Sequence, residues 1–236
     1  MIAAAVPSSA AALLDLLARD PGRPRITWYG DDGERVELSG AVLGNWVSKT
    51  TNLLVEELDV APGHRVLIDL PPHWRTLVWA LATWRAGACV VVAGDADVVV
   101  TTRPSEHRGD VVAVSLPALA RRFDGDLPPG ALDAAASVMT YGDVVGWVPP
   151  ADPGAPALEG VAHAELAAWW APFVPGRRLL VEAGEDVAAF LQTVARELAA
   201  DGSVVALSPG RSSTLHQDPA ALARLLDGER AVVGTP

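Results

Sequence analysis

The stretch RVLIDLPPHWRTLVWALATWRAGACVVVA, residues 65–93, predicts a strand, a helix and a second strand in immediate succession. Residues 65–70 form a short apolar run, which is typical of a strand buried on both faces, and Pro71-Pro72 end it. Residues 74–86 predict a helix that is apolar on most sides, and residues 88–93 predict the next buried strand. Such a unit indicates a parallel sheet with helices on its faces.

The same alternation continues on both sides of this unit. A turn signal at residues 30–33 lies between two short strand-like segments and predicts a β-hairpin. Ser39 is a suitable N-cap for a long helix with one buried face. The other expected elements are helices at 13–18, 39–58, 116–123, 162–171, 185–200 and 219–226, and strands at 97–101, 110–115, 178–182, 203–207 and 231–234. This order predicts an α/β fold with mostly parallel sheets and helices on both faces.

A stretch rich in proline and glycine, residues 127–156, separates two alternating halves. Because these residues interrupt regular structure, the stretch is the best candidate for a seam. We therefore expect one domain, 1–236, with two similar αβ lobes at 1–135 and 136–236. A chain of this length buries roughly 70% or more of its unfolded surface, so its core needs no disulfide or metal.

The charge of the chain narrows the classes of partner. There are 18 basic and 29 acidic residues, which gives a formal net charge of −11. This balance argues against nucleic acid and against an anionic membrane as partners, because both bind clustered Lys and Arg. The longest apolar runs are shorter than a membrane span, and Met1–Ala12 lacks the basic residues of a signal peptide. We expect no membrane contact and a cytoplasmic location.

The sequence predicts no metal site and no disulfide. Cys89 is the only cysteine, and the five histidines lack the three- or four-residue spacing of a helical metal site. Of the 18 basic residues, 17 are arginine and one is lysine, Lys49. Together with the abundance of alanine, this indicates a GC-rich, actinobacterial-type coding sequence. We expect Lys49 to be a solvated residue of the early helix.

Several motifs occur in the order that is found in acyl-CoA synthetases and other AMP-forming ligases. They lie at residues 38–58, 63–72, 79–92, 201–205, 218–222 and 235–236. Each motif is weak alone, but their shared order covers nearly the whole chain. The chain therefore resembles a truncated, degenerate member of the acyl-adenylate-forming superfamily, represented by its N-terminal part only. The resemblance implies the two-lobed N-terminal domain of those enzymes, which activate a carboxylate with ATP and commonly transfer the acyl group to coenzyme A.

The segment ADPGAPALEGVAH, residues 151–163, matches the phosphate-binding loop of this family. Gly154, Pro156, Gly160 and His163 are retained, and these are the cofactor-binding candidates that the resemblance implies. The serines, threonines and lysine of the family loop are missing, however, and Asp152 and Glu159 place negative charge where polyphosphate would lie. Two interpretations remain: a surface loop without nucleotide, so that no cofactor is expected, or a weakened site for ATP or AMP.

The resemblance also implies elements for which the sequence has no room. The family's adenine loop, its ribose-binding acid and its C-terminal domain with a catalytic Lys all lie beyond the matched part. Removing one such transition-state contact typically costs about 10²–10³-fold in rate. We expect no catalytic residues here, and a non-catalytic remnant that acts as a binding or interaction module. The alternatives are a subunit of a split AMP-forming ligase completed by a partner chain, and a binder of a small acyl or adenine group.

Two further candidates come from the residues themselves. His73 follows the strand at 65–70, where the family often has Asn and where α/β proteins bind ligands, although an ordinary polar loop residue fits equally. The hydroxyl-rich segment 208–214 is either an anion site or a turn. The eight tryptophans indicate a packed core or an exposed apolar surface that binds a second copy or a partner protein.

Overall fold

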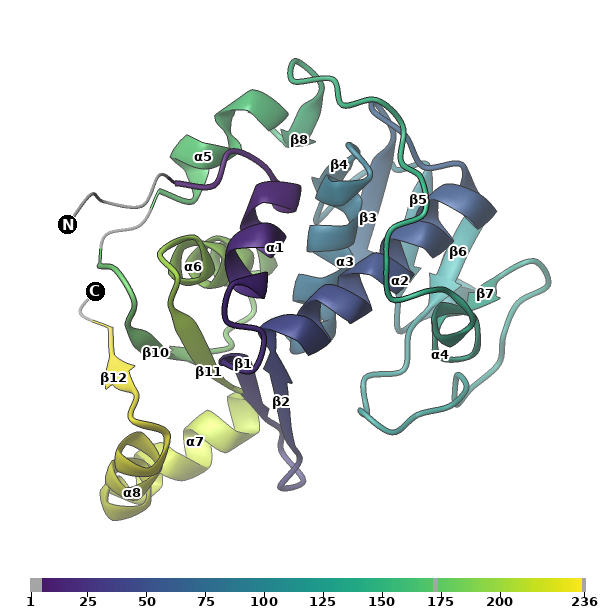
Figure 1. Ribbon diagram of the computed structural model, residues 1–236. Coiled ribbons are helices and arrows are strands. Elements are labelled where there is room, and N and C mark those ends of the chain that lie inside the picture. The colour runs from purple at the N-terminus through teal and green to yellow at the C-terminus, as the bar shows by residue number, and fades with distance from the viewer. Residues whose placement is uncertain (1–5, 172–173, 235–236) are drawn as a thin grey trace. The chain divides into compact units, whose positions relative to one another are not determined.

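The computed structural model describes residues 6–171 and 174–234 (Figure 1). The chain forms two compact units. The first unit comprises the described residues of Met1–Leu43, Pro72–Trp74 and Ala167–Pro236, and the second comprises Gly44–Pro71 and Arg75–Leu166. This division differs from lobes at 1–135 and 136–236, because the N-terminal hairpin pairs with strands from the C-terminal part of the chain.

The first unit is built on a five-stranded, mostly parallel sheet. In spatial order its strands are β12 (Val232–Val233), β10 (Arg178–Glu182), β11 (Ser203–Leu207), β1 (Pro24–Tyr29) and β2 (Arg35–Ser39). The predicted hairpin is confirmed, since β1 and β2 are antiparallel. β1 also lies parallel to β11, with Ile26 opposite Val204.

Four of the described helices accompany this sheet, and side chains cap the starts of all four. The helices are α1 (Ala10–Ala18), α6 (Val187–Ala199), α7 (Pro209–Gln217) and α8 (Pro219–Glu229). Ser9, Asp186 and Asp218 accept hydrogen bonds from backbone N–H groups in the first turns of α1, α6 and α8. These caps explain why the helices begin where the sequence changes from polar to apolar.

The core of the first unit follows from the alternation of side chains along β11. Val205 and Leu207 pack with Leu180 and with Leu215 of α7, next to apolar residues of α8. Val204 lies on the opposite face of the strand and is fully buried. A strand with both faces buried is the expected consequence of helices on both sides of a parallel sheet.

The second unit contains a fully parallel five-stranded sheet. Its spatial order is β4 (Cys89–Val91), β3 (Arg65–Asp69), β5 (Val98–Thr101), β6 (Asp110–Ala113) and β7 (Leu132–Asp133). The predicted strand–helix–strand unit is therefore confirmed as β3, α3 (Trp74–Arg85) and β4. Gly87 turns the chain between α3 and β4 with φ of +84°, and a Cβ there would lie 3.0 Å from Pro62 Cγ.

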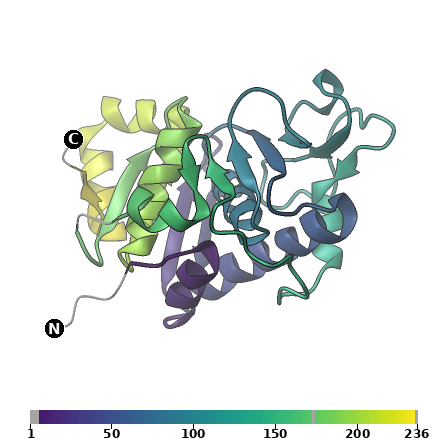
Figure 2. The same cartoon turned by 90° about the horizontal axis from the view of Figure 1, so that it is seen from above.

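The remaining elements are one long helix and several short segments. They are α2 (Gly40–Leu58), α4 (Ala134–Ser137), α5 (Leu166–Trp169), the strands β8 (Pro156–Leu158) and β9 (Val161–Ala162), and 3-10 turns at Pro104–Glu106, Val138–Thr140 and His163–Glu165. The predicted N-cap of α2 is confirmed by a hydrogen bond from Val42 N to Ser39 Oγ. Figure 2 shows the same elements from above.

The sequence-based prediction is wrong for two helices. Residues 116–123 do not form a helix, because the carbonyls of Leu116, Pro117 and Ala118 accept hydrogen bonds from Arg75 instead of from a helical backbone. Conversely, the hydroxyl-rich segment after Ser208 is the helix α7. Two of its hydroxyl side chains bond back to carbonyls four residues earlier: Ser213 Oγ to Pro209 O and Thr214 Oγ1 to Gly210 O.

Two features are absent from the described residues. No helix among them is both long enough and apolar enough to cross a membrane. No group of three or more His, Cys, Asp or Glu side chains within 6–171 and 174–234 is arranged to hold a metal ion. The motif at Thr235-Pro236 and the first five residues of the predicted non-signal segment lie outside the described part of the chain.

Candidate functional site

The segment that matches the family's phosphate loop folds as a short β-hairpin in the second unit. β8 and β9 pair antiparallel, with Leu158 opposite Val161. Glu159 and Gly160 make the turn between them, and Gly160 has φ of +74°, a conformation that favours glycine. Of the predicted site residues, Gly154, Pro156, Gly160 and His163 are thus brought together, and Gly160 has a structural reason to be glycine.

The backbone amides of this hairpin bond within the hairpin itself. Asp152 Oδ1 accepts a hydrogen bond from Gly154 N at 2.9 Å, and Asp152 O accepts one from Ala155 N at 3.1 Å. His163 N donates to Ala155 O at 3.0 Å, and Ala164 N donates to Pro153 O at 2.9 Å. Donors that a phosphate cradle would turn toward its ligand are therefore committed to Asp152 and to the opposite strand.

His163 anchors the hairpin to the sheet. Its Nε2 lies 3.2 Å from the carbonyl oxygen of Ala88, just before β4. Burial lowers the pKa of His163 below its usual value, although the Ala88 carbonyl opposes the shift. The neutral ring with its proton on Nε2 suits this contact. Trp84 Nε1 adds a second anchor by donating to Ala157 O at 2.9 Å.

His73 belongs to the first unit, whereas the hairpin belongs to the second. Its side chain is buried. The imidazole makes an edge contact with Trp28 at a centroid distance of 4.6 Å and lies 5.6 Å from the Trp74 ring. Two aromatic rings therefore pack against the buried imidazole.

A polar cluster at the carboxyl ends of β3 and β5 was not predicted from the sequence. Asp69 accepts hydrogen bonds from Thr101 Oγ1 at 2.6 Å and from Arg103 Nη2 at 2.9 Å, and His107 Nε2 lies 3.1 Å from its Oδ2. Burial would raise the pKa of Asp69, but these hydrogen bonds and the Arg103 charge lower it. The available signal was an Asp directly after the three apolar residues 66–68 of the strand.

A cavity of about 550 Å³ adjoins this cluster within the second unit. Its lining includes Ser105, His107, Arg108, Asp126, Leu127 and Pro128. Ligand pockets commonly have volumes of about 300–1,000 Å³. The cavity combines apolar walls with one guanidinium, one imidazole and one carboxylate, and so offers polar anchoring for a small amphipathic molecule.

The hydroxyl-rich segment 208–214, the candidate anion site, already holds a carboxylate. Asp31 Oδ1 accepts hydrogen bonds from Ser208 Oγ at 2.5 Å and from Arg211 N at 3.1 Å, at the start of α7. A Cβ at Gly210 would lie 2.4 Å from the same oxygen. The positive end of the helix is therefore neutralised by a side chain of the protein.

Lys49 is not solvated as the sequence suggested. Its Nζ lies 3.0 Å from Asp143 Oδ1 and donates a hydrogen bond to Tyr141 O at 2.5 Å. The only lysine of the chain thus connects α2 to the segment that follows α4. This is a structural role.

The chain has a close relative among curated proteins. A TIGR03089 family protein of Mycobacterium tuberculosis is 34% identical over 237 residues, and the match covers 93% of this chain and 94% of the relative. The sequence matches no family model.

Three solved structures of similar fold are larger than this chain. An acyl-CoA synthetase from Brucella canis superposes with a TM-score of 0.66 at 16% identity, covering 84% of this chain and 43% of that one. An acetoacetyl-CoA synthetase from Streptomyces lividans has a TM-score of 0.66 at 18% identity, and the match covers 85% of this chain and 38% of that one. An amide bond synthetase from Marinactinospora thermotolerans has a TM-score of 0.63 at 15% identity, and the match covers 95% of this chain and 48% of that one. The chain spans less than half the length of these structures. It belongs to the TIGR03089 family and has the fold of the N-terminal part of adenylate-forming enzymes.

Proposed function

We propose that this chain is a non-catalytic member of the adenylate-forming fold that acts as a binding or interaction module. The observation that carries the proposal is the closed hairpin at residues 151–163, in which Asp152 bonds the amides of Gly154 and Ala155. The residues present do not fit a triphosphate, because the donors it needs are already bonded and a carboxylate stands beside them.

The charges of the hairpin support the same proposal. Two unit charges of like sign about 4 Å apart repel by about 4 kcal/mol at an effective dielectric constant of 20. Asp152 and Glu159 are both exposed on the hairpin, so a bound polyphosphate would meet this repulsion without a lysine to offset it. Lys49 is held by Asp143 elsewhere in the second unit.

Exchange of pyrophosphate into ATP tests this proposal directly. The purified protein, incubated with ATP and a panel of carboxylic acids, is expected to give no exchange above a protein-free blank. Tm should also stay unchanged on addition of ATP or AMP, since a ligand that binds only the folded state must raise it. Exchange that depends on the protein would overturn the proposal.

A double variant, Asp152→Asn with Glu159→Gln, distinguishes two reasons why the hairpin would not bind nucleotide: its negative charge and its closed backbone conformation. The amide side chain that Asp152→Asn introduces would keep an oxygen acceptor for the Gly154 N–H but lose the negative charge. If ATP raises Tm of this variant but not of the wild type, charge is what excludes nucleotide. If neither responds, the closed hairpin is sufficient to exclude it.

A small-molecule binder is the second candidate, and the cavity beside His107 and Arg108 favours it. Calorimetric titration with acyl-adenylate analogues, adenosine and medium-chain carboxylates tests this function. Binding that is lost in Arg108→Ala would support it. Flat titrations with every compound would remove it.

A subunit of a split ligase is the third candidate, and the length of the match favours it, because the chain covers only 38–48% of its structural neighbours. This function requires a partner chain that supplies the ribose-binding acid and the catalytic Lys. Co-expression with the products of neighbouring coding regions should then yield a complex with exchange activity. Absence of such activity from every combination would count against it.

A further inference from the structure

A short segment of the second unit, which we call the strap (residues 141–147), is fixed along α2 by side chains of that helix. Lys49 pairs with Asp143, and the Asn52 side chain makes three hydrogen bonds to the strap: its Nδ2 donates to Val144 O at 3.0 Å and to Gly142 O at 3.5 Å, and its Oδ1 accepts from Gly146 N at 3.0 Å. Asn52 is buried. The strap backbone therefore has a defined conformation although it contains no regular structure.

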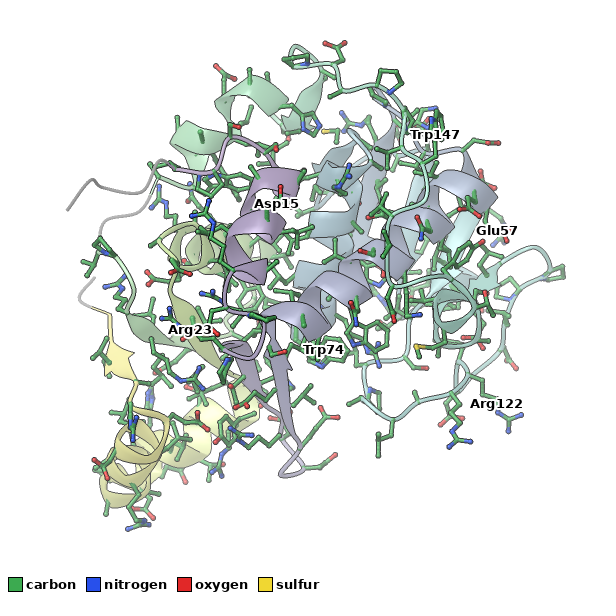
Figure 3. All side chains as sticks on the ribbon, viewed as in Figure 1. Asp15, Arg23, Glu57, Trp74, Arg122 and Trp147 are labelled. Carbon is green, nitrogen blue, oxygen red and sulfur yellow. The ribbon has the colours of Figure 1, made fainter. Side chains whose placement is uncertain are left out.

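This fixed backbone presents apolar side chains to solvent. Val144 is 77% exposed and Trp147 is 65% exposed. A tryptophan held outward by a preorganised backbone loses little conformational entropy when a partner covers it. Tryptophan is also among the residues that most often dominate the energy of interfaces. Figure 3 labels Trp147 and, on the last turn of α2, Glu57.

The surroundings of the strap are acidic. Glu56 and Glu57 are exposed, and Asp143 is largely exposed despite its contact with Lys49. A Cβ at Gly146 would lie 3.7 Å from Glu56 Oε1, so this carboxylate borders the strap. Tyr141 donates to Glu57 Oε1 at 2.7 Å, and its pKa is raised by burial and by Glu57 and Glu56. The local potential is therefore negative.

We propose that the strap and the adjoining acidic end of α2 form a docking surface for a basic segment of a partner protein. An Arg or Lys of that segment stacks on the Trp147 indole, which attracts cations through its ring face. Neighbouring basic groups pair with Glu56 and Glu57, and an apolar side chain covers Val144. This inference rests on the proposed function as an interaction module, and it names the class of partner.

Charge complementarity decides against a second copy of the chain as the occupant. Each copy carries a formal net charge of −11, so two copies repel each other. A basic segment gains instead from the same charge, which accelerates its encounter with the surface.

The test uses a fluorescein-labelled peptide of alternating arginine and leucine, with fluorescence anisotropy as the readout. A peptide with glutamate in place of arginine is the reference. We expect binding of the basic peptide only, with Kd rising steeply between low and high salt. Trp147→Ala should raise Kd by about tenfold, as for an interface residue of central importance. Because Trp147 is exposed, this variant should keep the wild-type Tm.

The charge control compares two double variants that each remove two negative charges. Glu56→Gln with Glu57→Gln should raise Kd at low salt and flatten the salt dependence. Asp110→Asn with Asp124→Asn, at two exposed positions of the same unit, should leave Kd within about twofold of wild type, because screened charges act locally.

Three outcomes would overturn the docking surface: equal binding of both peptides, equal effects of the two double variants, or no effect of Trp147→Ala. A dimer in sedimentation velocity that dissociates in Trp147→Ala would show that a second copy occupies the surface, and would overturn the assigned partner. The pyrophosphate exchange assay does not depend on the strap. Exchange activity would therefore contradict the proposed function, whereas failure of the peptide-binding test would contradict only the docking surface.

Discussion

Arg178 Nη2 donates a hydrogen bond to Glu229 Oε2 at 2.5 Å, which joins the last turn of α8 to β10 of the first unit. The other oxygen of Glu229 accepts hydrogen bonds from Tyr29 at 2.5 Å and from Arg35 at 2.9 Å. One carboxylate thus connects α8 with three strands of the sheet. Burial opposes its charge, but Tyr29, Arg178 and Arg35 together lower the pKa of Glu229 to about 2.

Glu229 makes the free energy of unfolding fall as the solution becomes acidic. Because its folded pKa lies below the ordinary value of 4.5, its contribution is fully present above about pH 4.5 and is lost as the pH falls toward 2. A shift of this size corresponds to about 3 kcal/mol. Glu229→Gln should therefore unfold at lower urea concentration near neutral pH, and its curve should approach that of the wild type in strong acid. Asp227→Asn, on the exposed side of the same helix, is the matched control and should change the free energy of unfolding by less than about 0.5 kcal/mol. A pH-independent difference would contradict this account.

Gly210 is required by the position of Asp31. A Cβ at residue 210 would lie 2.4 Å from Asp31 Oδ1, so Gly210→Ala must displace the carboxylate that caps α7. We expect a loss of about 1–3 kcal/mol, typical of overpacking combined with a lost cap. The loss should be smaller when Asp31 is already replaced by alanine, and a double-mutant cycle measures that coupling.

Gly228→Ala in α8 is the control for this prediction. A Cβ there meets nothing within 4 Å, so the substitution should stabilise the helix by about 0.5–1 kcal/mol through reduced backbone entropy. Equal effects of the two glycine substitutions would refute the steric argument.

His163 gives the stability of the protein a second pH dependence, which comes from a buried base instead of a buried acid. Burial lowers its pKa, so the unfolded chain binds the proton more tightly, and stability falls as the pH drops below about 6.5. His163→Gln should remove this decline while keeping an N–H donor for the Ala88 carbonyl. Tm measured across this range for both proteins checks the prediction, and an NMR titration of His163 that gives an ordinary pKa would contradict it.

Asp69 organises the carboxyl ends of β3 and β5. Asp69→Asn would keep the acceptor for Thr101 Oγ1 but weaken the charged contacts from Arg103 and His107. We expect a loss of about 1–3 kcal/mol, the range for hydrogen bonds to a charged group. Asp110→Asn, at the exposed start of β6, serves as the control for charge. Similar urea midpoints for both variants would show that the cluster contributes no more than a surface charge.

Much of the architecture could be predicted because its signals are local. β10 and β11 begin and end where the apolar runs predicted, since a buried parallel strand is read from a continuous apolar segment. The helix predicted at 185–200 is confirmed as α6, with Asp186 as its N-cap. The predicted helix at 116–123 failed for a long-range reason, because Arg75 takes carbonyls that a helix would need.

The sequence by itself determined most strands of the two five-stranded sheets, most helices and the residues of the loop at 151–163. Only the tertiary structure decided that β1 pairs with β11, that Asp31 caps α7 and that Glu229 connects α8 to the sheet. It also decided that Asp152 closes the hairpin on itself and that Lys49 fixes the strap. The physical reason is that periodicity and caps act over a few residues, whereas these contacts join side chains and backbone groups whose approach depends on how the whole chain packs.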